Sequence, residues 1–112
     1  MKVILSKEAK SDMDNIYKYI ARESIKYAIE NDKAIRTTIH KLEFYPYSGR
    51  YIPEFSNKKY RELIFNHYRI FYEVIEEKEC VYIHFIVHGK RNFKSFYLSQ
   101  PLWVLPFPSP LL

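Results

Sequence analysis

An α+β fold, with a two-helix hairpin packed on a mostly antiparallel sheet of about four strands, is predicted by two observations on the sequence. Apolar residues recur every three or four positions over residues 7–42, which is the period of an amphipathic helix. Beyond residue 60 apolar and polar residues alternate, which is the period of a half-buried strand. The 112 residues suffice for one domain. The expected order is strand, two helices, three strands and a short C-terminal helix.

The first half of the chain predicts a strand followed by the two helices. The apolar run Lys2–Leu5 precedes Ser6, a residue type that commonly caps a helix N-terminus. A helix over residues 7–22 then carries an apolar stripe made of Ala9, Met13, Ile16 and Ile20. Ser24 can cap a second helix, which Pro46 stops. The stripe of that helix consists of Ile25, Ala28, Ile35, Ile39 and Leu42.

The second half of the chain predicts a loop and then three strands. Residues 45–57 hold two prolines and one of the two glycines, so we expect a loop there. The expected strands cover residues 60–65, 69–74 and 81–88, with a polar turn at residues 76–79 between the last two.

Strict alternation along these strands predicts which side chains share a face of the sheet. With both helices on one face, the other face would carry Arg69, His84 and His88 and would be open to a ligand. Arg61 falls on the core side of its strand. It either escapes at the entrance of the strand, or a bulge changes the register.

Composition excludes several classes of protein. The single Cys80 allows no internal disulfide, and the four histidines show no metal-ligand spacing, so we expect no metal and no cofactor. No Ser/His/Asp triad or glycine-rich phosphate loop has a candidate. No leader segment or membrane-spanning run stands out, so a cytoplasmic protein without a membrane partner is expected. The net charge of +5 favours an acidic partner.

The end of the chain differs in composition from the rest. Four of the six prolines lie within the sequence PLWVLPFPSPLL. Since proline interrupts both helices and central strands, we expect residues 1–98 to form the domain and residues 99–112 an apolar tail.

The order of the elements and two motifs, YRELIFNHYRIFYEV and HGKRNF, resemble the RelE/ParE superfamily of bacterial type II toxins. The segments SKEAKSDMDNIYKYIARE and KLEFYPYSGR look more like the ParE branch, whose hairpin is long. The ParE branch poisons DNA gyrase without catalytic residues of its own. The RelE branch cleaves messenger RNA on the ribosome.

The RelE resemblance implies a candidate catalytic site. Its arginine in the YR strand, its arginine in the GKR segment and the tyrosine six residues later match Arg69, Arg91 and Tyr97. A guanidinium can bind two phosphate oxygens at once and stays ionised. Arg61 and Glu62 stand where the RelE pattern has two lysines, so His88, or in second place His84, is the expected substitute for the general base. His88 or Tyr97 would transfer protons to or from the reacting groups. The expected RNA- or phosphate-binding residues are Lys59, Arg61 and Lys90.

Three functions follow from the resemblance. The main hypothesis is a metal-independent messenger RNA endoribonuclease that acts on the ribosome. The first alternative is a poison of DNA gyrase, and the second is an inert relative that only binds its antitoxin. In each case a small acidic antitoxin is the expected partner. It would bind over the basic surface through a helix or a strand and neutralise Arg61, Arg69 and Arg91.

Overall fold

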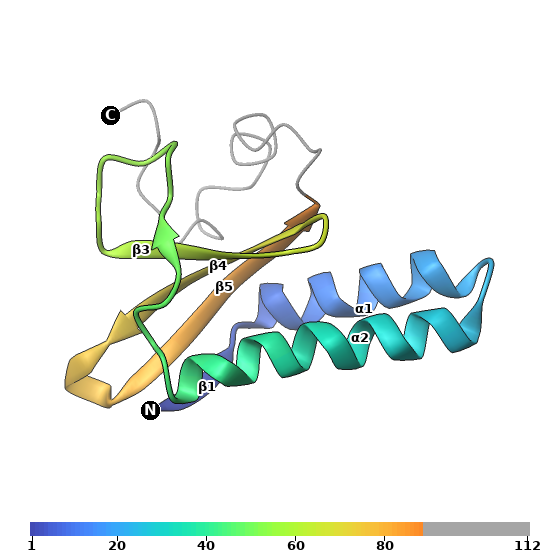
Figure 1. Cartoon of the computed structure of the whole chain (residues 1–112), viewed down its shortest axis with the longest axis horizontal. Helices are drawn as coiled ribbons and strands as arrows, with labels where there is room; N and C mark the ends of the chain where they lie inside the picture. Colours follow the sequence, from blue (N-terminus) through green and yellow to red (C-terminus); the bar gives the residue numbers. More distant parts are fainter. Residues whose placement is uncertain (89–112) are drawn as a thin grey trace.

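The computed structural model describes residues 1–88, which form a mixed five-stranded sheet with a helix hairpin on one face (Figure 1). The elements are β1 (Lys2–Leu5), α1 (Lys7–Ala21), α2 (Ile25–His40), the 3-10 helix η1 (Lys41–Glu43), β2 (Arg50–Tyr51), β3 (Tyr60–Phe65), β4 (Tyr68–Ile75), the 3-10 helix η2 (Glu76–Lys78) and β5 (Cys80–His88). The predicted α+β architecture is confirmed. The additional strand is β2, which lies within the predicted loop.

The sheet has the strand order β1-β5-β4-β3-β2. β1 lies at one edge of the sheet and runs parallel to β5. The chain between these two strands includes the helix hairpin, β2, β3 and β4, which is long enough for the crossover that parallel pairing requires. The pairs β5–β4, β4–β3 and β3–β2 are antiparallel. Consecutive strands of the second half therefore lie side by side, as their short connections predict.

The hairpin covers one face of the sheet and builds the main core. The buried residues of this core are Ala9, Met13, Ile35, Ile39, Leu42, Ile70, Tyr72, Val81, Ile83 and Ile86. Most of the predicted helix stripes are thus confirmed. Ile25 is the exception, being 63% exposed. It begins α2 at the tip of the hairpin, which projects past the sheet (Figure 1).

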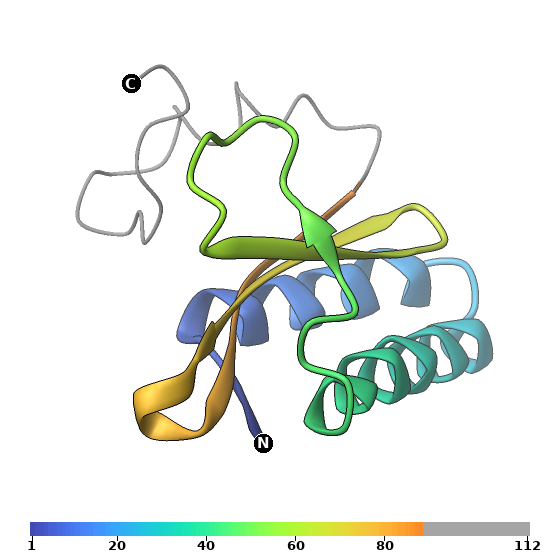
Figure 2. The same cartoon turned by 60° about the vertical axis from the view of Figure 1, so that its left-hand side comes forward.

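The opposite face of the sheet is covered, so the prediction of an open face is wrong. The loop between β2 and β3 arches over this face, away from the helices (Figure 2). It contributes to a second apolar cluster composed of Ile52, Phe55, Tyr60, Phe71, Phe85 and Val87. Burial of this apolar surface holds the loop against the strands.

A β-bulge in β5 changes which side chains share a face. Phe71 pairs with Phe85 and Tyr72 pairs with Ile83, so His84 is an extra residue in β5. The cap residue of α1 and a side chain of α1 bind the backbone at the bulge and two residues after it. The Ser6 hydroxyl, which also caps α1, donates to the His84 carbonyl over 2.8 Å, and the Ile86 amide donates to Asp12 over 3.0 Å.

The remaining predictions about the fold concern the end of the chain. The predicted C-terminal helix and the boundary between residues 1–98 and 99–112 lie outside the described residues. Within residues 1–88, neither α1 nor α2 is long and apolar enough to cross a membrane.

Candidate functional site

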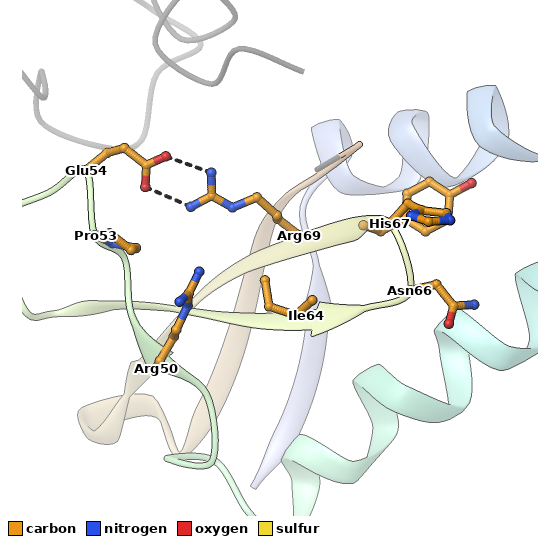
Figure 3. A pocket seen from close by; sticks show the side chains of 8 residues that line it. Arg50, Pro53, Glu54, Ile64, Asn66, His67 and Arg69 are labelled. Carbon is orange, nitrogen blue, oxygen red and sulfur yellow. Dashed lines mark hydrogen bonds and ion pairs between the residues drawn. The ribbon is translucent and has the colours of Figure 1, made fainter. Parts of the chain in front are cut away.

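Arg69 is bound on all three of its guanidinium nitrogens by carboxylates. Nη1 and Nη2 donate to the two oxygens of Glu54 over 2.7 and 2.8 Å, and Nε donates to Glu62 over 2.7 Å. Figure 3 shows Glu54 reaching from the loop to the guanidinium. The hydrogen bonds from Arg69 lower the pKa of Glu54, and Glu54 in turn raises the pKa of Arg69. Arg69 thus clamps the loop onto the sheet.

Glu62 is the buried centre of this ion-pair network. The residue is 1% exposed, and Arg50 donates to its other oxygen over 2.7 Å. The carboxylate therefore binds two arginines, one from β2 and one from β4. A buried carboxylate needs such partners, because its desolvation is costly without them. Arg50, Glu54 and Arg69 of this network line a pocket of about 440 Å³ together with Ile64 and Asn66 (Figure 3).

A second buried pair lies on the same face of the sheet. His84 is 4% exposed and its Nε2 lies 2.8 Å from Glu73. Lys59 lies 3.3 Å from the other oxygen of Glu73, so this predicted phosphate ligand also faces a carboxylate. Burial lowers the pKa of His84 more than Glu73 raises it.

His88 lies on the opposite face of the sheet from Arg69. It pairs with Tyr68, whereas Arg69 pairs with Val87, and alternate residues point to opposite faces. The His88 ring stacks on His67 at 5.8 Å and meets Tyr68 edge-on. The structure therefore does not bring the predicted base together with Arg69, because the bulge at His84 shifts the alternation before His88 is reached.

Arg61 escapes at the entrance of β3, the first of the two predicted alternatives. No register shift separates β3 from β4, and Leu63 and Phe65, on the same side of the strand, pack on the main core. The Arg61 guanidinium donates to the carbonyls of Tyr47 and Gly49 over 3.3 and 2.8 Å. It lies at the edge of the core instead of within it.

The other predicted site residues are Lys90, Arg91 and Tyr97, which lie outside the described residues. Among the predicted residues that are described, Lys59 and Arg69 face carboxylates, Arg61 binds backbone carbonyls, and His88 lies across the sheet from Arg69. A contribution of these seven residues to toxicity stays a prediction.

An apolar groove that the sequence analysis did not predict runs between the hairpin and the ends of β4 and β5. Its volume is about 410 Å³, and most of its exposed lining is apolar or aromatic, with Ile16, Tyr19, Ile20, Tyr27, Tyr68 and Ile86 among the residues. The polar residues of the lining are Asp12, Asn15, Asn31, Asn66, His67 and His88. Tyr19 and Tyr27 are 71% and 58% exposed. The sequence feature that could have predicted this groove is the pair Tyr19 and Tyr27, one on each helix of the hairpin, because tyrosine is enriched where proteins bind one another.

Comparison with known proteins identifies the class of this fold. A solved structure described as "Chromosomal ParDE TA system from P. aeruginosa" contains a chain with the same fold, with a TM-score of 0.68 at 18% identity. The match covers 80% of this chain and 97% of the other. Among curated proteins, none matches this sequence.

The family is more specific than the fold. The model of the family "ParE toxin of type II toxin-antitoxin system, parDE" matches residues 3–93. The chain belongs to this family and is a toxin of the type II toxin–antitoxin class. The prediction of a messenger RNA endoribonuclease is wrong, because the matched family is the ParE branch and the nuclease activity was implied by the RelE branch.

The buried His84 predicts a pH dependence of stability. Below the ordinary histidine pKa, about 6.5, the unfolded chain binds a proton that the folded chain takes up only at lower pH. The free energy of unfolding should therefore fall as pH drops through this range. Urea unfolding at about pH 7.5 and about pH 5.5 should show a smaller difference for His84→Gln than for the wild-type chain. His40→Gln, at an exposed position, is the control; an equal pH difference in all three proteins would contradict the prediction.

Proposed function

We propose that this toxin arrests growth by binding DNA gyrase and trapping it on cleaved DNA, without a catalytic residue of its own. Membership of the ParE family supports this target. One observation on the geometry carries the proposal. Arg69 forms ion pairs within the chain, and Glu54 and Glu62 bind all of its guanidinium nitrogens.

The state of Arg69 matters because phosphate cleavage needs donors aimed at the reacting phosphate. Such donors stabilise the extra charge of the transition state only if they are available to it. A phosphate at Arg69 would have to displace Glu54 and would then lie beside the buried Glu62. The repulsion between these anions disfavours phosphate at this position.

The groove at the hairpin supports protein binding instead. An apolar groove beside two exposed tyrosines is a suitable surface for an amphipathic helix. We infer that the cognate antitoxin places an apolar helix face there. Neutralisation of Arg69 by the antitoxin is unnecessary, because Glu54 and Glu62 already balance its charge.

Purified protein in two assays tests the proposed function. In a supercoiling reaction with gyrase, ATP and plasmid, we expect linear DNA that appears after protease treatment, because the trapped enzyme holds a double-strand break. In a translation reaction on a reporter transcript, primer extension should find no new 3′-ends. New ends that appear only on translated message, with intact plasmid in the gyrase reaction, would refute the proposal.

A further inference from the structure

An exposed group of tyrosines and cations lies on the connection from α2 to β2, on β2 and at the start of β3, and it shares no residue with the groove lining. We call Tyr47, Tyr51, Lys58 and Arg61 the aromatic platform. Tyr47 and Tyr51 are 47% and 46% exposed. Tyr45, in the turn directly before Tyr47, is 69% exposed. Large exposed aromatic groups of this kind are typical of the centre of a protein interface.

Arg61 is held in place by aromatic rings and neutral hydrogen-bond acceptors, which do not neutralise its positive charge. Its guanidinium lies 4.5 Å from the centre of the Tyr51 ring and 5.3 Å from that of Tyr47. Its recorded hydrogen bonds go to two carbonyls and to the Tyr51 hydroxyl, all of them neutral. Lys58 lies over the same Tyr51 ring at 5.5 Å. The structure of residues 1–88 records no ion pair for either cation, in contrast to Arg50, Lys59 and Arg69.

The fixed geometry of the platform favours binding. A guanidinium already stacked and hydrogen-bonded loses little further freedom when a partner binds, so the usual entropic cost is small. Its positive charge and the adjacent ring surfaces suit a carboxylate flanked by apolar side chains.

Carboxylates beside the platform disfavour a nucleic acid. The Tyr47 hydroxyl donates to Glu76, so Tyr47 lies between this carboxylate and Arg61. The pocket of about 440 Å³ at this position is lined by Lys58, Lys59 and Arg61 but also by Glu73, Glu76 and Glu77. A polyanion would bring several phosphates close to these acidic groups, whereas a protein can place a single carboxylate at Arg61 and Lys58.

We propose that the aromatic platform contacts the protein target of this toxin through a carboxylate-bearing segment of that target, while the antitoxin occupies the groove at the hairpin. The inference rests on the proposed function in that it assigns the platform to the target. The two surfaces have different chemistry, since the groove is apolar and the platform is cationic and aromatic.

Two variants test the platform independently. Tyr51→Ala removes the ring on which both cations lie, and Lys58→Glu reverses a charge without touching the hydrogen bonds of Arg61. Each is expected to raise the amount of toxin needed for growth arrest about tenfold or more, because substitutions at the centre of an interface weaken binding by that much. The readouts are growth arrest on induced expression and affinity for the antitoxin encoded beside the toxin. Ile29→Ala, at a 53% exposed position outside the platform and the groove lining, is the matched control.

Reduced growth arrest with retained antitoxin affinity and an unchanged thermal midpoint in Lys58→Glu and Tyr51→Ala would support the inference. Wild-type arrest in both variants would overturn it. Parallel loss of antitoxin affinity would overturn it too, because the platform would then belong to the antitoxin. If the wild-type chain binds oligodeoxythymidine, and the two variants lose this binding together with growth arrest, the platform would bind nucleic acid and the inference would be overturned. Growth arrest by the wild-type chain without trapped gyrase would refute the gyrase target alone.

Discussion

Arg69→Met is expected to lower the free energy of unfolding by about 3 kcal/mol, the lower end of the range for breaking a buried ion pair. The substitution leaves Glu62, which is 1% exposed, with Arg50 as its recorded arginine partner. It also releases Glu54 and with it the loop that covers the sheet. We place the effect at the lower end because the Glu54 side chain is 34% exposed and water screens its part of the network. Urea unfolding followed by far-ultraviolet circular dichroism measures the change.

Two further variants separate this effect from a general loss of charge. Arg36→Met breaks a surface pair with Asp32 on α2 and should cost less than about 0.5 kcal/mol. Adding Glu62→Gln to Arg69→Met removes the partly unpaired buried charge and should restore part of the stability. If Arg69→Met is as mild as Arg36→Met, the ion-pair network does not hold the loop.

The same result bears on how toxicity data for Arg69 are interpreted. Release of this loop would uncover the apolar cluster beneath it and lower the amount of folded toxin, whatever the target. Loss of growth arrest in Arg69→Ala is therefore no sign of catalysis unless the variant keeps its fold. The pair of Tyr51→Ala and Lys58→Glu is more informative, because Lys58 is an exposed residue outside the ion-pair network.

Local sequence patterns predicted α1, α2 and four of the five strands described within residues 1–88, but not the two-residue β2. The stripe containing Ala9 and Met13 and the cap at Ser6 define α1, and the structure begins the helix one residue after Ser6. Alternation likewise defines β4, where Ile70 and Tyr72 face the helices. Such signals are local, since they depend on which residues lie within one or two turns of one another.

The arrangement of the predicted site was not accessible in the same way. The backbone at the bulge is bound by the Ser6 hydroxyl, which donates, and by the Asp12 carboxylate, which accepts, and both residues are far away in the sequence. The bulge moves His88 to the other face of the sheet. Likewise, nothing local pairs Arg69 with Glu54, which lies 15 residues earlier in a loop. Sequence identifies a set of cations, whereas the tertiary fold decides which of them remain unpaired.

Gly49→Ala is expected to destabilise the chain by about 3 kcal/mol, the upper end of the usual range for an overpacked site. A Cβ at this position would lie 2.5 Å from the Tyr72 hydroxyl and 2.6 Å from the Glu62 carbonyl oxygen. Tyr72 is fully buried, and its hydroxyl accepts from the Gly49 amide and donates to the Pro46 carbonyl, so the ring has little room to move. The measurement is again the free energy of unfolding in urea.

The contribution of the Tyr72 hydroxyl to this destabilisation can be separated from that of the other contacts. Tyr72→Phe in the Gly49→Ala background removes the hydroxyl but leaves the Glu62 carbonyl, a backbone atom of β3, and the ring carbon Cε1 of residue 72, which would lie 2.8 Å from the new Cβ. Gly49→Ala should therefore cost less stability in the Tyr72→Phe background than in the wild-type chain, but it should still be destabilising there. Ser48→Ala, at the exposed neighbouring position, should change stability by less than about 0.5 kcal/mol. Equal stability of Gly49→Ala and Ser48→Ala would show that the connection from α2 to β2 does not pack against Tyr72 as described, and the aromatic platform would lose its support.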